Sequence, residues 1–160
     1  MRFILVGLML VVTASSSLAK PYGNARFGYF VDVPDIVSSN KAESENGDGA
    51  SFKSSDGAVA LTTYGAWLQD ENYAQAFKQL IKYAQQDGWS VSYQRISPKG
   101  FGVYSGSKAG RIFYGRAVPS CGGKAIATYQ IEYPAAQRAT YDAMLKRLNA
   151  SLKAGKGTCG

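Results

Sequence analysis

The sequence contains no histidine among its 160 residues. This absence excludes Ser-His and Cys-His nucleophilic catalysis, and it removes both the commonest general base and the ligand of most transition-metal sites. Phosphate-binding loops are missing too, because the turns Asp56-Gly57 and Gly122-Gly123 lack the Lys-Ser/Thr that a P-loop needs. The sequence therefore shows no recognisable catalytic, metal or nucleotide motif, and we expect no metal and no cofactor.

Long hydrophobic runs are also missing, except for one at the amino terminus. Arg2 precedes the apolar run Phe3–Val12, and Ser17-Leu18-Ala19 then places small residues, Ser17 and Ala19, where signal peptidase requires them. The run is shorter than the roughly 20 residues of a membrane span. We therefore predict a signal peptide at residues 1–19, one domain at residues 20–160, and a periplasmic or secreted location without a membrane span.

Cysteine is scarce, and both cysteines, Cys121 and Cys159, follow the signal. An even pair in an oxidising compartment predicts a disulfide bond. Their spacing matches neither a CxxC redox motif nor a zinc site. We expect a structural disulfide that holds the carboxyl-terminal tail against the domain.

Acidic residues are scarce in the second half of the chain. Residues 88–160 hold 11 basic residues and only 2 acidic ones, whereas residues 20–87 hold 6 basic and 9 acidic residues. The asymmetry predicts a basic face suited to an acidic protein, an anionic lipid or a polysaccharide. The alternative is a dispersed set of solvated charges, because no run of basic residues occurs. Nucleic acid is a poor candidate, because no binding motif for it is present.

The first part of the domain shows strand periodicity. Apolar residues alternate over residues 27–33 and predict a strand. The polar stretch 38–49 predicts a surface loop. Two short strands are expected next, around Phe52 and over residues 59–63, with a hairpin turn at Asp56-Gly57 between them.

Helical spacing replaces the alternation after this hairpin. Asp70 is a candidate N-cap, and Gly88 suits the left-handed residue that closes a helix. One helical face is predicted to hold Tyr73, Phe77, Leu80, Ile81 and Ala84.

The remaining chain predicts four strands and a second helix. Strands over residues 91–93, 101–103, 112–118 and 127–133 are joined by tight turns, which requires an antiparallel meander. Pro134 then starts an amphipathic helix that frays after Leu152. The expected fold class is α+β, with helices packed on an antiparallel sheet in the order β-β-β-α-β-β-β-β-α.

This order and several short strings resemble the PsbP-like fold, named for the extrinsic P protein of photosystem II. More closely, they resemble small exported proteins of proteobacteria that share the fold. The resemblance implies an α/β/α sandwich around an antiparallel sheet, and members of this fold bind proteins rather than share a chemistry. The strings that carry it include Arg26-Phe27-Gly28-Tyr29, Asn46-Gly47-Asp48-Gly49, Gly110-Arg111-Ile112-Phe113-Tyr114, Cys121-Gly122 and Glu132-Tyr133-Pro134.

The predicted meander mixes tyrosine with arginine, which is the composition of recognition surfaces. Core packing is the alternative role for the tyrosines. The candidate residues for binding a partner are Arg95, Tyr104, Arg111, Tyr114 and Arg116.

Two functions remain open at this point. The first is a non-enzymatic binding or accessory protein that acts on an acidic envelope or secreted protein, with an immunity-type inhibitor as one variant. The second is a hydrolase of an envelope polymer that uses Glu132 and Asp142, because two facing carboxylates suffice for glycoside hydrolysis. The acidic residues near Asp48 do not match the EF-hand spacing, and a solvated loop is the expected role for them.

Overall fold

The computed structural model describes residues 20–155 and residue 159, so the predicted signal peptide lies outside the described residues. The strands form two antiparallel sheets. The smaller sheet has the order β1-β2-β10, with β1 at Lys20–Asn24, β2 at Tyr29–Val33 and β10 at Lys153–Ala154.

The larger sheet has seven strands in the order β3-β4-β5-β9-β8-β7-β6, and every neighbouring pair is antiparallel. The predicted meander is confirmed as β6 to β9, which are consecutive both along the chain and across the sheet. The strands are β3 (Asn40–Glu43), β4 (Gly49–Lys53), β5 (Ala60–Trp67), β6 (Ser90–Ile96), β7 (Gly102–Lys108), β8 (Arg111–Ser120) and β9 (Ala125–Pro134).

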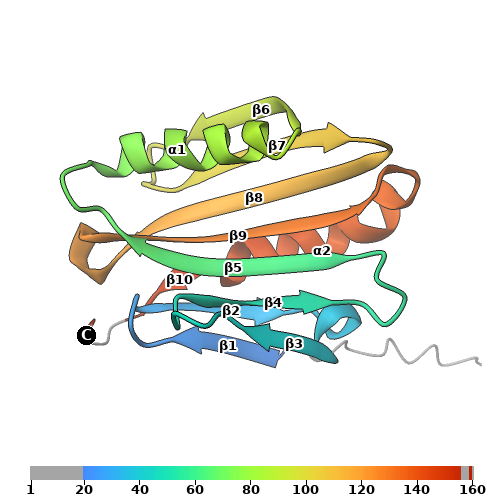
Figure 1. The fold of residues 1–160 in the computed structure, drawn as a ribbon, viewed down its shortest axis with the longest axis horizontal. Coiled ribbons are helices and arrows are strands. Elements are labelled where there is room, and N and C mark those ends of the chain that lie inside the picture. Colours follow the sequence, from blue (N-terminus) through green and yellow to red (C-terminus); the bar gives the residue numbers. More distant parts are fainter. Residues whose placement is uncertain (1–19, 156–158, 160) are drawn as a thin grey trace, which may run out of the picture.

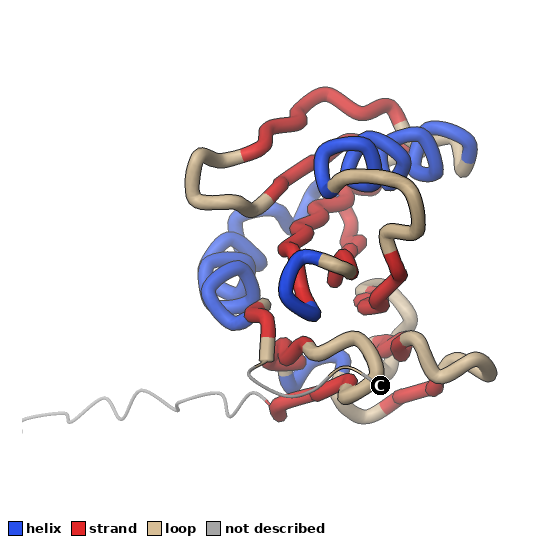
Figure 2. The backbone as a smooth tube through the Cα atoms, turned by 90° about the vertical axis from the view of Figure 1, so that its left-hand side faces the viewer, coloured by secondary structure: helices blue, strands red, loops and turns tan. Residues whose placement is uncertain are grey.

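The two helices, α1 (Tyr73–Gln86) and α2 (Arg138–Ser151), lie on opposite faces of the seven-stranded sheet (Figures 1 and 2). The smaller sheet packs on the same face as α2. The α+β class and the sandwich of helices around an antiparallel sheet are therefore confirmed. Neither of the described helices has the length and hydropathy that crossing a membrane requires.

The predicted helical face is confirmed in α1, because its apolar positions are buried against the sheet. Phe77 and Leu80 pack with Tyr104, Phe113 and Ile126. Complete burial of one such side chain contributes roughly 1.5–3 kcal/mol, so this stripe accounts for the attachment of α1.

The start of α1 differs from the sequence prediction. Asn72 is the N-cap instead of Asp70, because its side chain accepts a hydrogen bond from the backbone N–H of Gln75 and the Gln75 side chain accepts one from the Asn72 backbone. This reciprocal capping box satisfies two backbone donors that a cap at Asp70 would leave open. Gly88 follows the helix with φ +86°, as predicted.

The strand count before α1 was underestimated, because β1 and β3 were not predicted. The stretch 38–49, expected to be a loop, contains β3, whose four side chains are all exposed. Its neighbour β4 provides the hydrogen-bonding partner, so the strand forms without burying apolar side chains.

The carboxyl-terminal elements also differ from the prediction. Pro134 is the last residue of β9, and a short 3-10 turn over Ala135–Gln137 precedes α2. After α2, the residues Lys153 and Ala154 do not fray but pair with β2 as the strand β10. The predicted apolar face of α2 is confirmed at Tyr141 and Leu148, which are buried.

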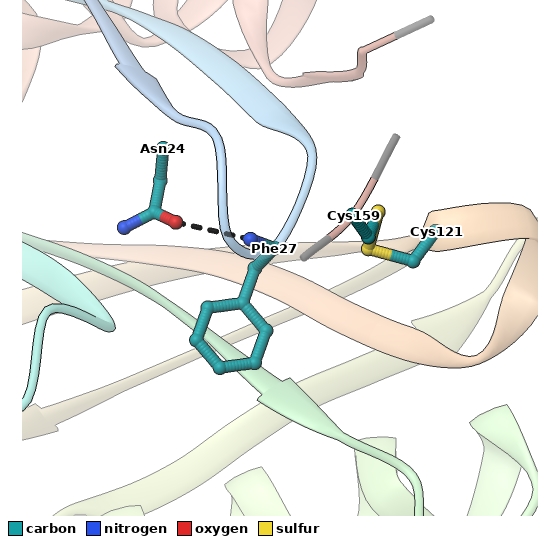
Figure 3. The surroundings of a disulfide bond; sticks show 4 residues. All are labelled: Asn24, Phe27, Cys121 and Cys159. Atoms are coloured by element: carbon teal, nitrogen blue, oxygen red, sulfur yellow. Dashed lines mark hydrogen bonds between the residues drawn. A yellow bond between two sulfur atoms is a disulfide. The ribbon is translucent and has the colours of Figure 1, made fainter. Parts of the chain in front are cut away.

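The predicted disulfide between Cys121 and Cys159 is confirmed. It joins the tail to the 3-10 turn Cys121–Gly123 between β8 and β9. Figure 3 shows the bond beside the turn from β1 to β2, where the Asn24 side chain accepts a hydrogen bond from the backbone N–H of Phe27 at 3.0 Å. The disulfide therefore ties the tail to the seven-stranded sheet at a point next to the smaller sheet.

Candidate functional site

A groove of about 590 Å³ lies on the α2 side of the larger sheet, between α2 and the strands β6, β7 and β8. Tyr93, Ser105 and Tyr114 form its floor as one cross-strand row, because Tyr93 pairs with Ser105 and Ser105 pairs with Tyr114. The helix α2 contributes Arg138 and Asp142 to the wall. The groove therefore combines aromatic rings, hydroxyl groups and one charge of each sign.

A second row continues the same face beyond the groove. Arg95 pairs with Val103, and Val103 pairs with Arg116, so the two arginines flank one small side chain. Side chains two residues apart on a strand share a face. Arg95 and Arg116 therefore lie on the face of Tyr93 and Tyr114. We call Tyr93, Arg95, Ser105, Tyr114 and Arg116 the arginine–tyrosine face.

Arg116 is held in a defined position on this face. Its guanidinium carbon Cζ lies 3.8 Å from the centre of the Phe101 ring, within the range of a cation–π interaction. Its Nε is buried and has no hydrogen-bond partner among the described residues. This nitrogen is closed to a partner, so an acceptor must approach the other nitrogens of the half-buried Arg116 guanidinium.

The arginines of the arginine–tyrosine face have no ion-pair partner in the part of the chain that the structure describes. Neither Arg95 nor Arg116 takes part in the ion pairs Lys41–Glu43 and Arg111–Glu132. Burial raises the pKa of Tyr114 above its ordinary value, and the positive charge of Arg116 offsets only part of this rise. The face can therefore receive carboxylates through its guanidinium groups and apolar or aromatic groups through its rings.

The five residues singled out in the sequence do not all lie on this face. The structure brings Arg95, Tyr114 and Arg116 together. Tyr104 points to the opposite side, where it is 2% exposed and packs edge-on against Phe77 of α1 at 5.7 Å between ring centres. For Tyr104, therefore, the core-packing role applies.

Arg111 also lies on the opposite side of the sheet. It is five residues before Arg116 on β8, and an odd separation reverses the face of a strand. There its guanidinium lies 4.0 Å from the Glu132 carboxylate. This separation could have been read from the sequence.

Tyr93 and Arg138 complete the groove and were not among the predicted residues. Tyr93 lies two residues before Arg95, so the same period of two would have identified it. Arg138 begins α2, and its approach to β6 and β7 depends on how α2 crosses the sheet. No local pattern in the sequence contains that information.

The two carboxylates considered for hydrolysis are separated by the sheet. Glu132 shares its face with Phe113, its cross-strand neighbour, which packs under α1. Asp142 lies on α2 and lines the groove on the other side. They do not face each other across a cleft, so they lack the arrangement that glycoside hydrolysis needs.

The acidic stretch around Asp48 likewise forms no convergent ligand set. Glu43 accepts a hydrogen bond from the Tyr22 hydroxyl and pairs with Lys41, whereas Asp48 accepts one from the Asn46 side chain. Across residues 20–155 and residue 159, no group of three or more His, Cys, Asp or Glu side chains is placed to hold a metal ion.

A second cleft of about 370 Å³ lies on the other face of the sheet, between β5 and α1. Buried Leu68, Leu80 and Ile126 are among its lining residues, and the exposed Asp70 and Glu71 lie at one end. No lysine or arginine lines it. The two hollows therefore differ in charge: this cleft is acidic, whereas the groove on the α2 side holds one residue of each sign, Arg138 and Asp142.

No family model and no curated protein sequence matches the chain. Solved structures do match. The solution structure of cyanobacterial PsbP (CyanoP) from Synechocystis sp. PCC 6803 is 9% identical, covers 92% of this chain and 98% of its own, and superposes with a TM-score of 0.62. The crystal structure of the Saccharomyces cerevisiae Ran-binding protein Mog1p is 8% identical, covers 87% and 96%, and has a TM-score of 0.58. The chain therefore has the PsbP-like fold.

Proposed function

We propose that this chain is a non-enzymatic binding protein that acts outside the cytoplasm on an acidic envelope or secreted protein. The arginine–tyrosine face is its contact surface. An inhibitor of the immunity type is one form that such a protein takes.

The observation that carries the proposal is the arginine pair in one cross-strand row. Arg95 and Arg116 flank Val103 and have no ion-pair partner among the described residues. The two arginines lie two strand spacings apart, roughly 10 Å, so their like charges repel each other weakly. A carboxylate from a partner would relieve this repulsion and satisfy the guanidinium donors.

The aromatic part of the face supports a protein partner over a free anion. Tyr93 is 48% exposed and lies in one row with Ser105 and Tyr114. Tyrosine and arginine are enriched where protein interfaces are most strongly stabilised. A small anion would use the guanidinium groups and leave these rings in water.

The similar structures and the disulfide support the proposal from two further directions. Yeast Mog1p is a Ran-binding protein, so at least one protein with a similar fold binds another protein. The Cys121–Cys159 disulfide suits an oxidising compartment, in agreement with the export signal predicted at residues 1–19.

The test is capture of partners from an envelope extract by the purified protein, at low and at raised ionic strength. The proposal expects one dominant acidic protein whose association rate falls as salt is added, because charges at the edge of an interface mainly steer association. The exposed Arg95 is changed to Glu in a parallel sample, and we expect capture to fall by about tenfold or more.

Arg111→Glu is the matched control, because it makes the same charge change on the same sheet but on the opposite face. Its capture should equal that of the unmodified protein. Equal losses from both variants would mean that only net charge matters, and the arginine–tyrosine face would not be the contact surface. Capture of no acidic protein from several extracts would overturn the proposed function.

A further inference from the structure

The free edge of β6 adjoins the arginine–tyrosine face. This strand ends the seven-stranded sheet, so one side of its backbone has no neighbouring strand among the described residues. Six of its seven residues are exposed. An edge strand presents unpaired N–H and C=O groups that can pair with another chain, and proteins usually protect such edges.

The two edges of the larger sheet differ in this protection. The opposite edge, β3, has no large apolar side chain, and Lys41 forms an ion pair with Glu43 on it. Charged side chains of this kind discourage pairing with another strand. The edge β6 instead exposes Tyr93 by 48% and Ile96 by 40%.

A bulge limits the available part of β6. The register with β7 shifts between Val91 and Tyr93, and bulges interrupt pairing at sheet edges. From Tyr93 to Ile96 the register is regular, opposite Ser105 to Gly102. Along an antiparallel strand, every second residue directs both its N–H and its C=O to the same side. Half of the residues from Tyr93 to Ile96 therefore offer both groups to an added strand.

A strand added there would place alternate side chains on the arginine–tyrosine face. One such side chain would lie next to Arg95, in the row that already contains Val103 and Arg116. The next would lie beside Tyr93, in the row of Ser105 and Tyr114. Cross-strand neighbours of opposite charge stabilise a sheet, so the position beside Arg95 suits glutamate or aspartate.

We propose that the partner binds by adding an extended acidic segment to the free edge of β6, paired with Tyr93–Ile96 and with a carboxylate beside Arg95. This inference rests on the proposed function and specifies how the same face is used. Strand addition takes its affinity from main-chain hydrogen bonds and its specificity from alternate side chains. Here the bulge sets the length of the paired segment, and the arginines set its charge.

The probe is a synthetic peptide of alternating glutamate and valine, bound to the full exported protein. Amide hydrogen exchange is followed with and without the peptide. The two residues of 93–96 whose amides face the free edge are expected to exchange at least about tenfold more slowly when the peptide is bound, because these amides become hydrogen-bonded. Two further peptides carry N-methyl groups, one on every glutamate and the other on every valine. Strand addition requires that one of them loses binding and the other retains it, because only alternate amides face β6.

Reversing the charge at Arg95 tests whether a carboxylate of the added strand lies beside this residue. Arg95→Glu should reduce affinity for the glutamate peptide by about tenfold and raise affinity for a lysine–valine peptide, whereas Arg111→Glu should change neither. Equal binding of both N-methylated peptides, or protection confined to α2, would overturn strand addition while leaving the proposed function intact. Failure of the proposed function is recognised separately, by the absence of an acidic protein in the capture experiment.

Discussion

Arg116 lies over the ring of Phe101, with its guanidinium carbon 3.8 Å from the ring centre. Phe101 precedes β7 and Arg116 lies on β8, so the contact depends on the pairing of these two strands. The ring covers one face of the guanidinium, and the charge stays on the side of the sheet that carries Arg95. The arginine–tyrosine face is thus preorganised at Arg116, which reduces the ordering cost of binding.

Phe101→Leu should uncouple this contact while keeping most of the apolar volume. A cation–π pair in a partly exposed position contributes about 0.5–1 kcal/mol. A double-mutant cycle with Arg116→Met, measured by chemical denaturation, should therefore return a coupling free energy of about that size. Additive effects of the two substitutions would mean that the ring only fills space.

The disulfide should contribute strongly to the free energy of unfolding. Cys121 and Cys159 are 38 residues apart, and closing a loop of this length stabilises by about 2–4 kcal/mol. Cys121→Ser with Cys159→Ser should lower the denaturation midpoint accordingly. Mass spectrometry of the unmodified protein, with and without reductant, should show the gain of two hydrogens on reduction. Free thiols in freshly exported protein would contradict the bond.

Gly28 should be coupled to the disulfide. It has φ +56°, and a Cβ added there would lie 2.8 Å from the Sγ of Cys159. Gly28→Ala should cost about 1–2 kcal/mol, from the left-handed backbone and from this contact together. In the variant without cysteines the tail can move away, so the same substitution should cost less there. If Gly28→Ala lowers the free energy of unfolding equally with and without the cysteines, the whole effect comes from the backbone conformation of residue 28.

Stability should fall in strongly alkaline solution through buried tyrosines. Burial raises the pKa of Tyr104 to about 12, whereas its ordinary value is 10.0. The folded protein therefore keeps this proton at a pH where the unfolded chain loses it. The contribution of protonated Tyr104 to the free energy of unfolding is therefore complete below about pH 10 and is lost as the pH rises to about 12. Urea denaturation across this range should show the decline, and Tyr104→Phe should make it shallower. An unchanged slope in that variant would contradict the assignment.

The N-cap of α1 can be assigned by a pair of substitutions. Asn72→Ala should destabilise the protein by about 1 kcal/mol, because it removes the side-chain half of the capping box. Asp70→Ala should have a clearly smaller effect, because Asp70 lies outside the helix. Thermal denaturation of both variants gives the comparison. A larger loss of stability from Asp70→Ala than from Asn72→Ala would mean that Asp70 is the N-cap.

The elements that could be predicted from the sequence are those specified by local chemistry. The stripe that includes Phe77 and Leu80 identifies α1 by its spacing, and Gly88 marks its end by the conformation that glycine adopts most easily. The β6–β9 meander follows from alternation and tight turns. The disulfide follows from the even count of cysteines in a chain whose sequence predicts export. None of these predictions needs knowledge of a distant neighbour.

The missed strands β1, β3 and β10 depend on partners instead. Their own residues have weak strand patterns, and each forms because a neighbouring strand supplies hydrogen bonds: β2 for β1 and β10, and β4 for β3. The pair Lys153–Ala154 shows this most clearly. A stretch that short has no stable structure alone, and β2 together with the nearby disulfide holds it in place.

The sequence by itself determined the residue types of the candidate site, the period that separates Arg111 from Arg116, and the charge asymmetry between the two halves. Only the tertiary structure decided that Arg95 and Arg116 flank the same valine, that Tyr104 is buried under α1, and that α2 forms a groove with β6 and β7. The physical reason is that side-chain direction along one strand follows from local geometry. Register between strands and the crossing of a helix over a sheet follow instead from how the whole apolar core packs.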